Sequence, residues 1–381
     1  MVQKVPVSGL ENAGGNFKNL LVNGDYQIWQ SGTSAATVTD SSSAGTYLAD
    51  RWQTWEDTGG TITQEQSALD NDDFETTGMR NALLVKCTGT DSSIGAAEFA
   101  FITQKIEAQN CQGLQYGTDN AKDVTLSFWV KSNLAATFTA VLRKPDSTYY
   151  YIPKEYTIAS ANTWQKVTLT YGPDDTNGSV IKASSGNIVN DNGEGIWVQF
   201  SLALGSNFHG TAGSWVSAVS GLGTSNQTNF MSSTSNNFYL TGVQLEAGSG
   251  ASDFEHLPFD VQLQRCQRYF YNLSSLGPYV PDSEASYLGT GFMYSSSYML
   301  CNVHLPVAMR TEPSLTTSNS SNHFMFYRNS AGDNCDDLTL SSSSSSIQAT
   351  LQNNTDISGT AGHAGGLVVQ AGSTCELSAE L

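Results

Sequence analysis

Residues 124–130, VTLSFWV, alternate apolar and polar side chains over a run of β-forming residues, and the turn residues KSN follow at 131–133. Side chains on a strand point alternately to its two faces, so this spacing predicts a strand with one buried face. Similar stretches recur between Gly, Asn, Asp and Pro residues, at 138–143, 149–152, 164–171, 196–204 and 238–246. Short strands between such turns predict a jelly-roll-like β-sandwich over residues 19–257.

The hydrophobic period changes after Pro258. Phe259, Leu263, Cys266 and Phe270 are spaced i, i+4, i+7 and i+11, which places them on one face of a helix. Proline suits the first turn of a helix, so we expect a linker helix over residues 258–272. Three copies of the helix around an axis would bury this apolar stripe; packing on the chain's own sandwich is the alternative.

Strand-like stretches resume beyond this helix. They occur at 292–294, 298–305, 324–327, 366–369 and 375–381 and predict a second β-sandwich over residues 273–381. The expected protein is therefore all-β, with two sandwich domains joined by a short α-helix. Residues 1–18 are expected to form an N-terminal attachment segment.

Charge and composition limit the kinds of partner. Lys and Arg count 17 against 35 Asp and Glu, which gives a net charge of −18. Such a field repels phosphate backbones, so we expect no nucleic-acid partner. No stretch approaches the length of a membrane-spanning helix and the first residues form no apolar signal region, so we expect no membrane insertion.

The cysteines show no C-x-x-C pairing. In a chain of this length a disulfide scaffold is not needed for stability, so we expect six free thiols, as suits assembly in a reducing cytoplasm. They are Cys87, Cys111, Cys266, Cys301, Cys335 and Cys375.

Catalytic and metal-binding signatures are missing from the sequence. It contains no G-x-S-x-G, H-E-x-x-H or phosphate-binding glycine motif, and its five histidines lie far apart. Residues 70–75 (DNDDFE) and 190–194 (NDNGE) resemble calcium loops in composition but not in spacing, and solvated turns are the alternative. We expect no catalytic residue, metal or cofactor. A structural Ca²⁺ held by separate loops and a glycan-cleaving carboxylate pair both stay open.

Aromatic side chains are the remaining signal for a binding surface. Trp52 and Trp55 lie close together, and Tyr149, Tyr150 and Tyr151 form a triplet on one expected strand. Tyr150 must face away from its two neighbours on such a strand, so at least one phenol is expected at the surface. Exposed rings stack on sugar faces, which makes these five side chains candidate glycan contacts. Packing against a second sheet or a partner subunit is the alternative.

Two segments resemble tail-fibre and related virion appendage proteins of tailed bacteriophages. Residues 19–32 (NLLVNGDYQIWQSG), with ADRW at 49–52, resemble the opening of many of these proteins. The Asn-Gly-Asp-aromatic core also resembles the first strand of jelly-roll carbohydrate-binding modules. Residues 242–248 (GVQLEAG), with FEHLPF at 254–259 and LQRCQRYF at 263–270, resemble the closing strand and linker helix of the same proteins.

A third similarity lies in the distal part, in residues 305–315 (LPVAMRTEPSL) and 377–381 (LSAEL). The three segments occur in the family's order and bracket nearly the whole chain. The resemblance implies a homotrimer on the tail or capsid surface of a virion, made in the host cytoplasm and attached to other virion proteins. Because a long virion-anchoring domain is missing, a short fibre, a fibre tip and a capsid appendage all stay open.

The function implied by this resemblance is attachment of the virion to a host-surface glycan or protein. The resemblance transfers no receptor-contact residue. One alternative is a purely structural decoration or connector protein without a receptor. The other is a glycan depolymerase, which the missing catalytic signatures disfavour.

Overall fold

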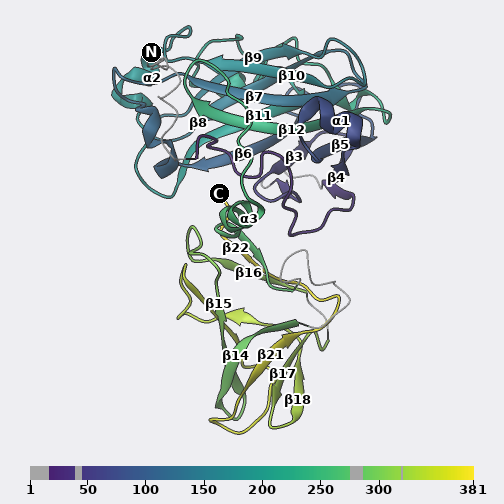
Figure 1. The fold of residues 1–381 in the computed structure, drawn as a ribbon, viewed down its shortest axis with the longest axis vertical. Helices are drawn as coiled ribbons and strands as arrows, with labels where there is room; N and C mark the ends of the chain where they lie inside the picture. The colour runs from purple at the N-terminus through teal and green to yellow at the C-terminus, as the bar shows by residue number, and fades with distance from the viewer. Residues whose placement is uncertain (1–16, 39–44, 275–285, 319–320) are drawn as a thin grey trace, which may run out of the picture. The chain divides into compact units, whose positions relative to one another are not determined.

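The chain divides into two compact units (Figure 1). The computed structural model describes residues 17–38, 45–274, 286–318 and 321–381, so all but the end of the expected attachment segment 1–18 lies outside the described residues. Unit 1 comprises Met1–Gln27, Ser34–Tyr47 and Trp52–Leu257, and unit 2 comprises Ile28–Thr33, Leu48–Arg51 and Pro258–Leu381. Two short segments from the early part of the chain thus belong to unit 2, which the order of the sequence does not suggest.

Unit 1 is a β-sandwich of two six-stranded antiparallel sheets, sheet 1 in the order β1-β4-β5-β12-β7-β10 and sheet 2 in the order β2-β3-β6-β11-β8-β9. The strands of sheet 1 are β1 (Ala36–Val38), β4 (Thr61–Ala68), β5 (Asn81–Gly89), β7 (Val124–Ser132), β10 (Gln165–Tyr171) and β12 (Asn237–Ala247). Those of sheet 2 are β2 (Thr46–Tyr47), β3 (Gln53–Asp57), β6 (Phe99–Glu107), β8 (Thr137–Lys144), β9 (Tyr150–Thr157) and β11 (Glu194–Leu204).

The alternation within β7 produces the core of unit 1. Its apolar positions Val124, Leu126, Phe128 and Val130 are fully buried. The Phe128 ring meets the ring of Phe200 from sheet 2 edge-on, with 4.9 Å between the centroids. These inward faces of the two sheets form the dry interior that the sequence period predicts.

Short helical segments occupy the connections of unit 1: α1 (Asn71–Thr77), α2 (Ser179–Lys182), η2 (Ala108–Leu114), η3 (Ser184–Gly186), η4 (Ser206–Phe208), η5 (Val219–Leu222) and η6 (Phe230–Ser232). The acidic stretch at 70–75 is neither a calcium loop nor a simple turn, because it starts α1. The Asp70 side chain accepts a hydrogen bond from the Asp73 backbone N–H, which caps the helix.

The opening and closing motifs of unit 1 lie against each other. The Asn19 amide nitrogen donates to the Val243 carbonyl, and the Asn19 amide oxygen accepts from the Leu245 backbone N–H. A β-carbon on Gly24 would lie 2.1 Å from the Val243 carbonyl oxygen, so only glycine fits there. Asn19 and Gly24 therefore allow the first and last segments of the sandwich to pack against each other.

Unit 2 contains two more antiparallel sheets, sheet 3 in the order β13-β22-β16 and sheet 4 in the order β18-β17-β21-β14-β15-β20-β19. A buried cluster that includes Met299, Phe324, Leu367 and Leu377 packs between them. The strands are β13 (Phe270–Asn272), β14 (Ser286–Ser295), β15 (Tyr298–His304), β16 (Ser314–Thr317), β17 (Phe324–Arg328), β18 (Ala331–Cys335), β19 (Thr339–Leu340), β20 (Gln348–Asn353), β21 (Ala364–Val369) and β22 (Cys375–Ser378). The all-β fold predicted from the sequence is confirmed.

The helix of unit 2, α3 (Phe259–Gln267), is shorter than predicted. Phe270 does not belong to the apolar face of this helix, because residues 270–272 form β13 and pair with β22. Cys266 is buried, whereas Phe259 and Leu263 are half-exposed and the polar Gln262 is buried in their place. The prediction that Phe259, Leu263, Cys266 and Phe270 form one apolar face of a helix is therefore wrong.

A buried polar contact ties the two early segments of unit 2 together. The Asp50 carboxylate accepts hydrogen bonds from the Gln30 backbone N–H at 2.7 Å and from the Gln30 side-chain amide. Burial raises the pKa of Asp50 to about 6, although both hydrogen bonds from Gln30 oppose the shift. Asp50 is therefore protonated more readily in the folded chain than in the unfolded chain.

We expect this carboxyl to make stability fall as pH rises. Its contribution is fully present below the unfolded pKa of ~3.9 and is lost as pH passes the folded pKa of about 6, a change of about 3 kcal/mol. Urea unfolding of the wild type and Asp50→Asn at pH 4 and pH 7 checks this. The wild type should lose stability relative to the variant over that interval, and a difference independent of pH would contradict the assignment.

Candidate glycan-binding site

Four side chains form one row across the outer face of sheet 2. The register pairs Lys105 of β6 with Trp197 of β11, Trp197 with Arg143 of β8, and Arg143 with Tyr151 of β9. We call this set the cation–aromatic row. It lies near the end of the sheet where β6 and β8 finish and β9 and β11 begin.

Cations occupy the space around the indole of this row. The Lys105 ammonium lies 4.2 Å and the Arg143 guanidinium 3.9 Å from the Trp197 ring centroid. Because β6 and β8 flank β11 on opposite sides, the two cations approach the indole from opposite sides. Trp197 is 7% exposed, so its ring has no free face for a sugar.

The tyrosine end of the row is more open. The Arg143 guanidinium donates to the Tyr149 hydroxyl at 3.0 Å, and the Tyr149 and Tyr151 rings stack with centroids 4.8 Å apart. Burial raises the pKa of both hydroxyls, although Arg143 opposes the shift, so both phenols stay neutral near pH 7. Tyr149 remains half-exposed, which leaves one phenol at the edge of the row.

The segment around η5 covers the middle of the outer face. Gln199 and Ser201 both donate from their side chains to the Leu222 carbonyl, at 3.2 and 2.9 Å. The backbone of Val216 pairs with that of Tyr151. The η5 segment therefore covers the centre of the face.

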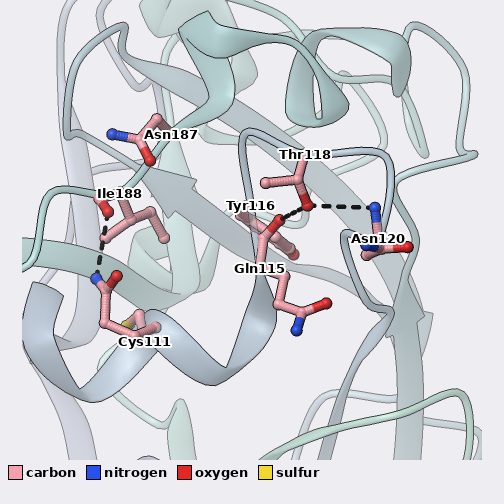
Figure 2. A pocket seen from close by; sticks show the side chains of 8 residues that line it. Cys111, Gln115, Tyr116, Thr118, Asn120, Asn187 and Ile188 are labelled. Atoms are coloured by element: carbon pink, nitrogen blue, oxygen red, sulfur yellow. Dashed lines mark hydrogen bonds between the residues drawn. The ribbon is translucent and has the colours of Figure 1, made fainter.

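An open hollow lies at this same end of unit 1 (Figure 2). Its volume is about 340 Å³. One wall comes from η2, which follows β6, and another comes from residues 187 and 188, which precede β11. Figure 2 shows Asn187 and Ile188 on one side and Thr118 and Asn120 on the other. The hollow is lined by Cys111, Gln112, Gln115, Tyr116, Thr118, Asn120, Asn187 and Ile188.

Hydrogen bonds fix both walls of the hollow. The Gln112 amide donates to the carbonyls of Ala108 and Ile188, at 2.9 and 3.2 Å, and so ties η2 to the opposite wall. The buried Lys144 ammonium donates to the carbonyls of Ser185 and Asn187 and so holds the wall that contains Asn187. Burial lowers the pKa of this lysine to about 8. The walls are thus held in place before any ligand arrives.

One residue of the lining, Tyr116, carries a buried hydroxyl without a partner in the described part of the chain. Tyr116 is 4% exposed, and its hydroxyl has no hydrogen-bond partner among the described residues. Burial raises the pKa of this phenol, which keeps it protonated. An unpaired buried hydroxyl costs roughly 1–3 kcal/mol of stability.

The structure separates the five aromatic candidates. Trp52 is fully buried and donates from its indole N–H to the Asn23 carbonyl, so its prediction as a glycan contact is wrong. Tyr150 faces away from its neighbours, as expected, and its hydroxyl pairs with Ser185. Trp55 is half-buried on the outer face of sheet 2, where it pairs with Phe101 in a different row. Tyr149 and Tyr151 lie at the cation–aromatic row.

Sequence reasoning missed the residues that line the hollow. Six of the eight come from residues 111–120, a long connection between two strands that is rich in amides and glycine. Connections of this kind often carry binding residues, so the length and composition of this segment could have indicated a binding site. Their convergence with Asn187 follows only from the pairing of β6 with β11.

One cysteine, Cys111, lines the hollow, and burial raises the pKa of its thiol. All six cysteines are free and buried, as predicted, and burial raises the pKa of Cys301, Cys335 and Cys375 to about 12. No group of three or more His, Cys, Asp or Glu side chains suited to a metal occurs among the described residues. Nor does the described part of the chain contain a helix long and apolar enough to span a membrane.

Unit 1 is an antiparallel β-sandwich with a polar hollow at one end of a sheet. No protein-family model matches the sequence, and no curated protein matches it. Similar solved structures are carbohydrate-binding modules. They include a putative sugar-binding protein from Bacteroides thetaiotaomicron (13% identity, TM-score 0.31, 60% of this chain and 100% of that chain). They also include a family 11 carbohydrate-binding module from Clostridium thermocellum (12% identity, TM-score 0.28, 58% and 98%).

A bacteriophage protein is also among the similar structures. The enzymatically active domain of tailspike protein 4 from bacteriophage CBA120 matches at 13% identity and a TM-score of 0.28, over 60% of this chain and 21% of that chain. All three similarities concern the fold alone.

Proposed function

We propose that this chain is a virion appendage of the tail-fibre type that binds a host-surface glycan in the hollow of unit 1. The observation that supports it best is the lining of that hollow. Six of its eight residues carry amide or hydroxyl groups, and none of the eight carries a charge. A volume of about 340 Å³ falls in the range of roughly 300–1,000 Å³ that small-molecule sites occupy.

The chemistry of the hollow suits sugar hydroxyls. An amide side chain offers both donors and acceptors, and so can pair with a hydroxyl group in either role. Gln115, Asn120 and Asn187 of the lining are exposed, so their amides are accessible to a ligand. The half-exposed Tyr149 ring at the same end of the sheet could then stack on a neighbouring sugar unit.

The proposal includes binding without cleavage. A glycosidase needs two carboxyl groups about 5–10 Å apart around the scissile bond. None of the residues that line the hollow is Asp or Glu. Chromatography of host polysaccharide after incubation with the protein should therefore show no shorter oligosaccharides, and their release would contradict this part.

Glycan binding is tested with an array of bacterial surface oligosaccharides and purified full-length chain. We expect Gln115→Ala/Asn187→Ala to weaken binding roughly tenfold or more, since each lost hydrogen bond contributes ~0.5–1.5 kcal/mol. Asn110→Ala is the matched control, because Asn110 is an exposed amide of η2 that does not line the hollow. Equal binding by the double variant and the control would refute the site.

The virion part of the proposal rests on the ordered sequence motifs, two of which meet at Asn19 and Val243. It includes a homotrimer attached to other tail or capsid proteins. Immunogold labelling of particles should place the chain on the virion surface, and light scattering should give three times the chain mass. Unlabelled particles would contradict the location, and a monomer at micromolar concentration would contradict the trimer.

A further inference from the structure

Sheet 4 of unit 2 presents a group of exposed aromatic side chains. Tyr287, Phe292 and Tyr294 of β14 are 62%, 40% and 65% exposed, and Tyr327 of β17 is 43% exposed. The intervening Leu288 and Met293 are buried in the core of unit 2. The alternation of β14, shifted by one residue at the irregularity between Tyr287 and Gly289, therefore places its aromatic residues on the outward face, which we call the aromatic face.

A glycine supports one ring of this face. Gly366 of β21 pairs with Tyr327 on one side and with Thr290 on the other. A β-carbon on Gly366 would lie 2.8 Å from Cε1 and 3.0 Å from Cδ1 of Tyr287. The Tyr287 ring thus lies over the space that a side chain would occupy and turns its other face to solvent.

Amide groups continue the same rows of the sheet. Thr290 pairs with Asn302 of β15, and Asn302 pairs with Thr350 of β20. The Asn302 amide oxygen accepts from the Thr350 hydroxyl at 2.9 Å and from the Gln348 amide at 3.1 Å. These bonds orient the exposed Asn302 amide so that its nitrogen is left as a donor beside the aromatic rings.

A second bond fixes the next row. The Tyr298 hydroxyl donates to the Gln352 amide oxygen at 2.7 Å, and the Tyr298 and Tyr294 rings meet edge-to-face with centroids 5.4 Å apart. Gln352 pairs with Leu300, which pairs with Phe292. In both rows, exposed aromatic rings are therefore followed by an amide, Asn302 or Gln352, whose orientation is fixed by hydrogen bonds.

Charge is missing from these rows. Their outward positions, from β18 to β19, hold Asn334, Met325, Val368, Tyr287, Gly332, Tyr327, Gly366, Thr290, Asn302, Thr350, Ala364, Phe292, Leu300, Gln352 and Thr339. None of these can ionise near pH 7, although the whole chain carries a net charge of −18. These rows therefore offer no cation to pair with an anionic sugar, and the exposed His304 lies in the next outward row, where it pairs with Gln348.

We propose that the aromatic face is a second glycan-binding surface, selective for uncharged sugars and independent of the hollow in unit 1. Sugar rings have apolar C–H faces that stack on aromatic rings and hydroxyls that pair with amides, and this surface provides both side by side. A second copy of this chain is a poorer occupant, since it would desolvate Asn302, Gln348 and Gln352 without supplying partners for each of them.

The test uses the full-length chain and an array of neutral hexose and N-acetylhexosamine oligosaccharides. Tyr287→Ala/Tyr327→Ala should weaken binding of the neutral probes about tenfold to a hundredfold. Gly366→Ala leaves both rings in the chain but displaces Tyr287, and should weaken binding in the same direction. Ile347→Ala is the matched control, because Ile347 is 69% exposed and lies outside these rows. Thermal melting confirms that each variant is folded.

The outcomes separate the two sites. Loss of neutral-glycan binding in the tyrosine and glycine variants, with Ile347→Ala unaffected, supports the aromatic face whatever the effect of Gln115→Ala/Asn187→Ala, which reports on the hollow alone. No binding of neutral probes by the wild type, or equal binding by all variants, overturns it. A tyrosine variant that loses oligomeric mass in light scattering but keeps its glycan binding also overturns it, since the face would then join copies of the chain.

Discussion

Replacing Trp52 with alanine should destabilise unit 1 by about 3–5 kcal/mol, the cost of emptying a large aromatic site in a packed core. The Trp52 ring is fully buried, with its centroid 5.1 Å from that of Tyr26 and 6.3 Å from that of Phe200. The variant would also remove the indole donor of the Asn23 carbonyl. Urea unfolding followed by tryptophan fluorescence, with circular dichroism as a second probe, measures the loss.

Trp55→Ala is the matched control for this prediction. Trp55 lies three residues further along the chain but is half-buried on the outer face of sheet 2, where it stacks on Phe101. We expect a smaller loss of stability than for Trp52→Ala, because less apolar surface returns to water. Equal losses in the two variants would contradict the assignment of Trp52 to the core.

Replacing Arg51 with alanine should cost unit 2 about 3–5 kcal/mol, because it leaves a buried carboxylate without its cation. Arg51 is 2% exposed, forms an ion pair with Glu380 and lies with its guanidinium 3.6 Å from the Tyr269 ring centroid. Chemical unfolding of the variant measures the loss. Arg80→Ala is the control, because Arg80 lies over Phe74 at the same 3.6 Å but is exposed.

A double-mutant cycle isolates the ion pair. Arg51→Ala/Glu380→Ala removes both charges, so the double variant should be more stable than the sum of the two single losses predicts. Strictly additive losses would show that Arg51 stabilises unit 2 through packing alone.

The alternation of the sequence predicted the strands of unit 1 from β7 onward, but neither β1–β6 nor the sheets to which the strands belong. Residues 124–130 and 138–143 became β7 and β8, each extended by one or two residues at one or both ends. These consecutive strands belong to opposite sheets, β7 beside β12 and β8 beside β11. A period of two residues determines which face of a strand is buried, whereas its neighbours depend on pairing between distant segments.

The helix prediction failed at Phe270, where the hydrophobic spacing of a helix continues into a strand. The apolar residue Phe270 continues the spacing of the helix, yet it belongs to β13 and pairs with Ser378. The helical period ends at Gln267 because the backbone beyond it bonds to β22. Local spacing could not reveal this, since the competing partner lies more than a hundred residues away in the sequence.

The site was less predictable than the fold. Trp52 and Trp55 are alike in the sequence, but one lies in the core and the other on the outer face. Gln115 and Asn187 are far apart in the chain and are brought together by the pairing of β6 with β11, after which Gln112 bonds to Ile188. Amide residues in connections carry no periodic signal, so the sequence alone could not distinguish these from other solvated side chains.

Hydrogen exchange with and without a bound oligosaccharide tests the central claim most directly. The measurement takes the tightest-binding glycan from the array and compares backbone exchange across the full-length chain. If the hollow of unit 1 holds the sugar, exchange should slow in residues 111–120 and 184–189, which form its walls and their support. Binding that leaves the exchange of both segments unchanged would contradict the account.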